Sequence, residues 1–371
     1  MFNNYQKYIS ILLAILVIPS AFSQSDDTEY SFFTAGHVYG NPNVPSYGIH
    51  QSFLDYFPQI NSDPKLQLGF FTGDVVKMPT AQYFDSLQID LDQLVMPYYI
   101  AAGNHDISNE FTERFGDYYY SFMYDSDLFI VLTPGLDQWN IQGEQLIFLE
   151  NTLESYANEA RYIFIMLHQL IWWSPDNVFR DVDINWEPHY PGSTNFDEVV
   201  KPLLLSYSNQ IVLYAGDVGS KPNVSPCMYY ENQNITYIAS GMGSNTQDNI
   251  VITNITENGL FFDLIALNGA DINAMGELTD WTINLNTNGL KNYQWEIYPN
   301  PVSGFLKLHS PISNSNTCEV IILNLFGERL LNATVKGTTN SIDISDFASG
   351  PYYLQIFKDK NLIEFHMFFK Y

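Results

Sequence analysis

Polar side chains of the kinds that bind metals and transfer protons follow five short apolar runs in this sequence. The runs cover residues 30–35, 66–72, 98–102, 162–167 and 211–215. The segments that follow them are Gly36-His37, Gly73-Asp74, Gly103-Asn104-His105-Asp106, His168-Gln169 and Gly216-Asp217. Carboxylate, carboxamide and imidazole groups without a thiolate suit a divalent or trivalent ion such as Mn, Zn or Fe. The residue types therefore predict a metal site with oxygen and nitrogen ligands.

Alternating strands and helices are expected to position these side chains. Apolar residues recur at helical spacing in four segments, residues 47–60, 81–94, 143–156 and 196–205. In an open α/β sheet, ligands bind beyond the carboxyl ends of the strands, where loops from several strands meet. A glycine begins four of these five segments, which fits a tight turn from strand to loop. After residue 226 the pattern changes to consecutive β-strands, at residues 235–239, 250–252 and 260–265.

The cysteine content excludes sites and folds that depend on thiolates or disulfides. Cys227 and Cys318 are the only two cysteines, and they lie far apart in the sequence. Neither a disulfide framework nor a thiolate metal cluster is possible with such a pair.

In this order, the motifs resemble those of the calcineurin-like metallophosphoesterases. The family pattern is Asp-x-His, Gly-Asp, Gly-Asn-His-Asp/Glu, a single His, and Gly-His-x-His. The resemblance covers about residues 32–219, and the Gly-Asn-His-Asp segment at 103–106 is its most specific part. It implies a four-layer α/β/β/α sandwich.

The resemblance also implies roles for individual residues. Asp74 would bridge two metal ions, and Asn104 and His168 would bind the second of them. His105 would act beside the phosphate, by stabilising its charge or protonating the leaving oxygen. Asp106 would orient that imidazole.

Two motifs depart from the family pattern. Ala35 replaces the first Asp, and Asp217 and Gly219 replace the two histidines of the last motif. One ion would therefore be bound by Asp74, Asn104, His168 and Asp217, and a second by His37 and Asp74 alone. One or two ions per chain are compatible with this set. Further donors are available in Tyr39, Asp176, Asp181, Asp183 and His189.

The long loop at residues 169–195 is rich in tryptophan. A loop of this length is uncommon without a function. Three tryptophan side chains would form a wall facing the substrate, or they would simply pack beneath the loop. These are Trp172, Trp173 and Trp186.

These features favour a secreted, metal-dependent phosphoesterase that hydrolyses a phosphate ester with metal-activated water. The substrate would be a small-molecule or polymer-linked phosphate ester. The alternative is an extracellular binding protein that kept the fold and lost the chemistry. Retention of Asn104, His105, Asp106 and His168 favours activity, whereas the changes at positions 35 and 219 favour its loss.

Charge is distributed unevenly along the chain. Fifteen Lys and Arg face 41 Asp and Glu, for a formal net charge of −26. Residues 24–290 hold 7 basic and 34 acidic side chains, and residues 291–371 hold 7 of each. An acidic surface of this kind excludes nucleic acid as a partner. The change in composition predicts a domain at 24–283, an Asn-rich linker at 284–292 and a second domain at 293–371.

The second domain has the pattern of a small all-β sandwich. Apolar and polar residues alternate in short runs at residues 305–308, 320–325 and 352–356. Three of its segments resemble the C-terminal sorting domain of the bacterial type IX (Por) secretion system: residues 297–303, 324–328 and 342–354. This resemblance implies that the secretion machinery is a partner. The alternative is an ordinary β-sandwich appendage, such as a carbohydrate-binding module.

The amino terminus has the pattern of a signal peptide. Lys7 precedes an apolar run at residues 9–18, and the small residues Ala21 and Ser23 follow. We predict a signal peptide at residues 1–23; a buried first helix is the alternative. No other segment approaches 18 uninterrupted apolar residues, so no stable membrane insertion is expected. The expected location is outside a bacterium or on its cell surface, reached through the periplasm.

Overall fold

The computed structural model describes residues 28–186, 194–244, 246–283, 295–309, 317–324, 328–337, 339–358 and 361–371. They form two compact units, residues 28–172 with 183–281 and residues 173–182 with those from 282 onward. The predicted signal peptide at 1–23 and linker at 284–292 lie outside the described residues. The domain boundaries placed there therefore stay predictions.

A five-stranded sheet carries the first three predicted strand ends. Its strand order is β11-β10-β1-β2-β3. The strands β1 (Thr28–Ala35), β2 (Leu66–Thr72) and β3 (Tyr98–Ala101) are parallel, with β3 at the edge of the sheet. The antiparallel strands β10 (Asn249–Thr256) and β11 (Gly259–Ala266) complete the sheet beside β1.

A six-stranded sheet carries the other two strand ends, in the order β4-β5-β6-β7-β9-β8. The strands β5 (Asp127–Val131), β6 (Tyr162–Met166), β7 (Gln210–Ala215) and β9 (Ile235–Ser240) are parallel. The edge strands β4 (Tyr120–Tyr124) and β8 (Cys227–Asn232) pair antiparallel to their neighbours. Parallel strands in both sheets bring several carboxyl ends to a common edge.

Apolar contacts hold the two sheets face to face. In the core between them, the ring of Phe32 lies edge-on to Phe70, Phe129 and Phe164, with centroids 4.9–5.4 Å apart. Such edge-to-face pairs stabilise a core beyond the area they bury.

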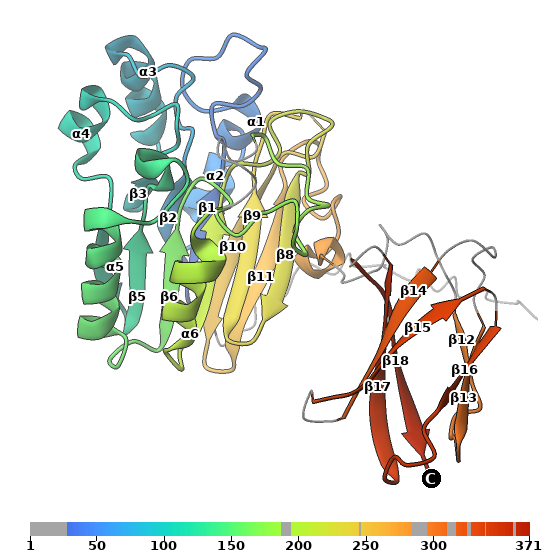
Figure 1. The fold of residues 1–371 in the computed structure, drawn as a ribbon. Helices are drawn as coiled ribbons and strands as arrows, with labels where there is room; N and C mark the ends of the chain where they lie inside the picture. Colours follow the sequence, from blue (N-terminus) through green and yellow to red (C-terminus); the bar gives the residue numbers. More distant parts are fainter. Residues whose placement is uncertain are drawn as a thin grey trace, which may run out of the picture. The chain divides into compact units, whose positions relative to one another are not determined.

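Helices cover the outer faces of both sheets (Figure 1). A second core joins the five-stranded sheet to α1 (Gln51–Leu54), α2 (Phe57–Ser62), α3 (Ala81–Leu91) and α4 (Asn109–Phe115). The helices α5 (Gly143–Tyr156) and α6 (Lys201–Leu205) lie against the six-stranded sheet, with a π-helical turn at Phe196–Val200 preceding α6. Short 3₁₀ turns occur at Pro134–Asp137 and Leu278–Trp281. The predicted four-layer α/β/β/α sandwich is confirmed.

The second unit is all-β, as predicted. One sheet contains β12 (Glu296–Tyr298), β13 (Phe305–His309) and β16 (Thr339–Asp343). The other contains β15 (Arg329–Lys336), β14 (Thr317–Leu323), β17 (Gly350–Lys358) and β18 (Asn361–Lys370). Alternate residues of these strands form a buried core that includes Leu306, Val320 and Leu354. Among the described residues, no helix has the length and apolarity needed to cross a membrane.

Candidate functional site

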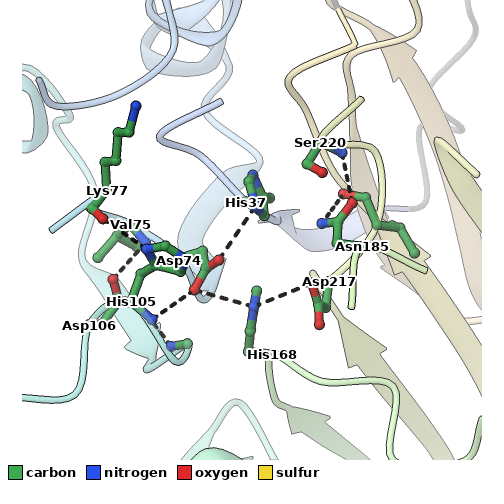
Figure 2. A network of polar contacts seen from close by, with 12 residues as sticks. His37, Asp74, Val75, Lys77, His105, Asp106, His168, Asn185, Asp217 and Ser220 are labelled. Carbon is green, nitrogen blue, oxygen red and sulfur yellow. Dashed lines mark hydrogen bonds and ion pairs between the residues drawn. The ribbon is translucent and has the colours of Figure 1, made fainter. Parts of the chain in front are cut away.

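The carboxylate of Asp74 lies between two buried imidazoles (Figure 2). Its Oδ2 is 3.4 Å from Nε2 of His37, and its Oδ1 is 3.3 Å from Nε2 of His168. On the far side of His168, Nε2 is 3.7 Å from Oδ1 of Asp217. Four of the residues predicted from strand ends thus form one connected network that involves both sheets.

The backbone at this site is held in an unusual conformation. His37 and Asp74 both have positive φ angles, 53° and 52°. Non-glycine residues rarely adopt this region, and it costs free energy unless the surroundings enforce it. Here the two loops are joined by hydrogen bonds from His37 N to the Gly73 carbonyl (3.1 Å) and from Tyr39 N to the Asp74 carbonyl (3.2 Å). A Cβ on Gly73, where φ is +81°, would lie 2.5 Å from the imidazole of His168.

The orientation of the His168 ring is fixed by the end of β2. Its Nδ1 donates a hydrogen bond to the carbonyl of Thr72 at 2.9 Å, so Nε2 faces the two carboxylates. Burial opposes protonation of this ring, but Asp74 and Asp217 outweigh that cost and raise its pKa to about 10. This imidazole therefore carries a proton at neutral pH when no other cation lies between the carboxylates.

The pKa values of the other groups in the network move in different directions. Burial raises the pKa of Asp217 to about 6, against the attraction of His168. Burial also lowers the pKa of His37 to about 4, although Asp74 opposes this. Burial alone would raise the pKa of Asp74, but His168 and His37 hold it below its usual range. Asp74 is thus the carboxylate of the network that stays ionised to the lowest pH.

The Gly-Asn-His-Asp segment lies against the same carboxylate. The backbone N–H of His105 donates to Oδ1 of Asp74 at 3.2 Å, and its Nδ1 is 2.8 Å from the carbonyl of Lys77. The carboxylate of Asp106 instead accepts hydrogen bonds from the backbone N–H groups of Gly103, Val75 and Val76, at 2.8, 3.0 and 3.1 Å. Lys77 therefore orients the imidazole of His105, a role that the sequence analysis assigned to Asp106. Burial and the charge of Asp74 raise the pKa of Asp106 to about 7.

The structure places Asn104 at the same strand end without joining it to the network. Its side chain is exposed, and it makes no hydrogen bond or ion pair within the described part of the chain. It is available to bind a ligand from solvent, and its predicted role as a metal ligand stays a prediction.

The residues present fit a metal ion, although no three His, Cys, Asp or Glu side chains among the described residues form a preassembled site. Three buried atoms of the network lack a hydrogen-bond partner: Nδ1 of His37, Nε2 of His168 and Oδ2 of Asp217. Buried polar atoms are normally paired, and unpaired ones are common where an ion or water binds. An imidazole 3.3 Å from one carboxylate and 3.7 Å from another provides the kinds of donor that Mn, Zn or Fe prefers.

Comparison with known families identifies both units. The model of the calcineurin-like phosphoesterases matches residues 37–234, which is more than half of the chain. The chain belongs to this family. A second model, the secretion system C-terminal sorting domain, matches residues 296–367. The predicted sorting domain is confirmed, and the protein is secreted or displayed at the cell surface by type IX secretion.

Individual relatives are distant. The probable glycerophosphodiester phosphodiesterase GpdQ of Arcobacter nitrofigilis is 27% identical over 132 residues, covering 32% of this chain and 48% of the relative. The chain thus spans about half the length of that relative. The purple acid phosphatase PPD1 from yellow lupin (Lupinus luteus) seeds has 16% identity and a TM-score of 0.47, covering 66% of this chain and 52% of that one. PorZ of the type IX secretion system of Porphyromonas gingivalis has 16% identity and a TM-score of 0.18, covering 33% and 15%.

One departure from the phosphoesterase pattern is built into the backbone. Gly219, in the position of the family's last histidine, has a φ of +74°. A Cβ there would lie 2.7 Å from the backbone of Gly241. A histidine at this position would be strained. The backbone of this chain is therefore adapted to glycine at position 219. The other lost position, Ala35, is fully buried at the end of β1.

Two residues near the phosphoesterase site escaped the sequence analysis. Asn185 donates to the carbonyl of Val218 at 3.1 Å and accepts from the N–H of Ser220 at 3.0 Å, which fixes the loop that carries Asp217 (Figure 2). Gln169 is fully buried beside His168, and neither polar atom of its side chain has a hydrogen-bond partner in the described structure. No motif marks either residue; adjacency to His168 is the only signal for Gln169.

The additional donors suggested by sequence have different surroundings. The ring of Tyr39 is buried with its centroid 4.5 Å from that of His37. Asp176, Asp181 and Asp183 are exposed, Asp181 with an ion pair to Arg180 at 3.8 Å. His189 lies outside the described residues.

The tryptophans of the long loop do not share one environment. Trp172 is buried against Tyr237 and Phe196, as the packing alternative expects. Trp173 is also buried, whereas Trp186 is 59% exposed.

Proposed function

We propose that this secreted phosphoesterase family member is an active, metal-dependent hydrolase that cleaves a phosphate ester with water. The observation that carries the proposal is the ionised carboxylate of Asp74 between two buried imidazoles. A structural scaffold has no need for such a buried charge, and its neighbours contain donor atoms without partners. A small-molecule or polymer-linked phosphate ester fits the family; the glycerophosphodiesters named for the relative in Arcobacter are one example.

The residues that would hold the metal follow from the network. Asp74, His168 and Asp217, with Asn104 from the neighbouring loop, would bind one ion, and His37 with Asp74 would bind a second. A bound ion lowers the pKa of a water and neutralises charge on the phosphoryl group. The carboxylate of Asp74 suits a bridging role, because its two oxygens face different imidazoles.

The chain's own groups would complete the chemistry. Because the carbonyl of Lys77 accepts from Nδ1 of His105, only Nε2 of that ring remains free to act on the substrate. With a proton on each ring nitrogen, the imidazolium would stabilise a phosphoryl oxygen through Nε2–H or give that proton to the departing alcohol. The alternative function, binding without hydrolysis, is supported by the changed ligand positions at Ala35 and Gly219.

Metal content and turnover test the proposal together. We expect the purified full-length protein to contain metal by mass spectrometry, and to release nitrophenol from aryl phosphate mono- or diesters in added Mn, Zn or Fe. Asp74→Asn is expected to lower kcat/KM by at least about 100-fold and to lower the metal content. Asp271→Asn, the same change at an exposed carboxylate, should leave both unchanged. Absence of bound metal together with absence of nitrophenol release would leave the binding protein as the correct function.

A further inference from the structure

A cavity of about 290 Å³ opens beside the candidate site, in the loop that follows β1. Its lining combines polar side chains, among them Asn41, Ser46 and His50, with the apolar residues Val44, Pro45 and Ile49. None of these residues is needed to hold a metal ion in the scheme above. A partly polar cavity next to a hydrolytic site requires its own explanation.

Tyr39 borders both this cavity and the candidate site. The centroid of its ring is 4.5 Å from that of His37 and 5.3 Å from that of His105. The same residue lines the cavity. A phosphate ester bound beside these two imidazoles would therefore have a compartment of this volume within reach of its ester substituent.

The loop that forms the cavity is anchored at three points. Its ends are joined by a hydrogen bond from His50 N to the carbonyl of Val38, at 2.7 Å. The N–H of Ile49 donates to Asp90 at 2.8 Å, and Nζ of Lys77 donates to the carbonyl of Val44 at 3.0 Å. The carbonyl of Lys77 also fixes His105, so one residue links the cavity wall to the imidazole that the proposed function places at the substrate. Compact loops closed in this way are frequently functional.

The hydrogen bond made by Nδ1 of His50 defines the role of its other ring nitrogen, Nε2. Ser52 Oγ donates to the buried carboxylate of Asp248 at 3.2 Å, and Nδ1 of His50 lies 2.8 Å from the same hydroxyl. Since the hydroxyl proton is directed to Asp248, Nδ1 must donate its own proton to Ser52. In the neutral ring Nε2 is then an acceptor, and it has no hydrogen-bond partner among the described residues.

Gly40 makes this placement of the imidazole possible. A Cβ at position 40, where φ is +85°, would lie 2.2 Å from Cδ2 of His50. The ring thus packs directly on the backbone of the cavity loop.

We propose that this cavity binds the alcohol portion of the substrate, that this alcohol bears free hydroxyl groups, and that Nε2 of His50 accepts a hydrogen bond from one of them. This inference rests on the proposed function, because it assigns the leaving group of the same reaction. A plain alkyl group would leave Nε2 of His50 without a hydrogen-bond partner, and a site built to hydrogen-bond a hydroxyl discriminates strongly against analogues that lack it.

Two non-hydrolysable phosphonates that differ only in hydroxyl groups test the inference. The full-length protein with added Mn²⁺ is titrated calorimetrically with 3,4-dihydroxybutylphosphonate and with butylphosphonate. We expect the dihydroxy compound to bind at least about tenfold more tightly. His50→Phe should reduce this ratio to about one while leaving the affinity for butylphosphonate unchanged.

Further variants separate specificity from loss of structure. Ser52→Ala should reduce the ratio by releasing the ring, and Ser52→Thr, which keeps the hydroxyl, should restore it. His309→Phe, the same change at a partly exposed histidine of β13, serves as the matched control and should have no effect. Equal affinities in the unaltered protein, or a ratio that survives His50→Phe, would overturn the inference and leave the proposed function standing. Failure of both phosphonates to bind, together with no hydrolysis of aryl phosphates, would overturn both.

Discussion

The two imidazoles that flank Asp74 differ in protonation although they face the same carboxylate. His168 faces a second carboxylate and donates to a backbone carbonyl, so its pKa rises to about 10 despite burial. His37 lacks these partners, and burial lowers its pKa to about 4. At neutral pH the metal-free site therefore holds one proton between Asp74 and Asp217. A metal ion must displace that proton to bind Nε2 of His168.

Metal affinity should accordingly rise with pH. Between pH 7 and 9 the proton on His168 is bound in the metal-free state and absent in the metal-bound state, so each pH unit should increase the affinity about tenfold. Calorimetric titrations with Mn²⁺ in buffers of different ionisation enthalpy should report the release of about one proton. Affinity independent of pH over this range would show that His168 is not a ligand.

At the scale of elements, one carboxylate ties two strand-to-loop turns together. Asp106 follows β3, yet it accepts hydrogen bonds from Val75 and Val76 after β2 as well as from Gly103. These three donors are backbone N–H groups at the edge where the site lies. Because both turns donate hydrogen bonds to the same side chain, the turn that carries Asp74 and the turn that carries His105 are held in a fixed relative position.

Asp106→Asn should loosen this edge. One of the three N–H groups would face the amide NH₂ instead of an oxygen, at a cost of about 1–3 kcal/mol for an unsatisfied buried donor. We expect a lower unfolding temperature and faster hydrogen exchange in peptides that cover residues 73–77 and 102–106. Asp92→Asn, at an exposed position in the turn after α3, provides the control. Unchanged exchange at both turns would contradict the role assigned to Asp106.

Sequence patterns predicted the strands that carry the site better than the hairpin of β4 and β5, which carries none of it. The predicted strand at 66–72 and helix at 143–156 match β2 and α5 throughout, because buried apolar runs and helical spacing are strong signals. The hairpin between β4 and β5 was missed. Its turn places Asp125 and Ser126 at φ angles of 45° and 68°, without the glycine that normally marks such a turn.

The predicted helix at 47–60 was only partly correct. In the structure α1 begins at Gln51, and a separate helix α2 starts at Phe57 with a proline in its first turn. The preceding residues form the cavity loop, whose conformation depends on distant partners such as Lys77 and Asp90. Contacts of this kind, like those of Asn185, have no local sequence signal. A local sequence signal did mark the strand ends that bring together His37, Asp74, His168 and Asp217.

At the scale of the whole molecule, the two domains carry separate tasks. The C-terminal sorting domain matches a family dedicated to secretion, and every residue assigned to the candidate site lies before it. Deletion of residues 291–371 should therefore leave kcat/KM for aryl phosphates unchanged while the protein stays inside the cell. Activity assays on the purified variant and its fraction in the culture medium measure these effects. Lost turnover in a folded, truncated protein would contradict the predicted boundary.

The acidity of the phosphoesterase segment leads to a prediction about salt. Residues 24–290 hold 34 acidic and 7 basic side chains, so an anionic phosphate ester approaches a surface of like charge. Raising the ionic strength from 0.01 to 0.15 M shortens the screening length from about 30 Å to about 8 Å and weakens this repulsion. At saturating metal, kcat/KM should therefore rise with salt, whereas a basic enzyme would lose activity. The increase should be larger for a dianionic aryl monoester than for a monoanionic diester, because repulsion scales with the charge of the substrate. A decrease with salt for both would indicate that the bound cations, and not the acidic surface, determine the field that the substrate meets.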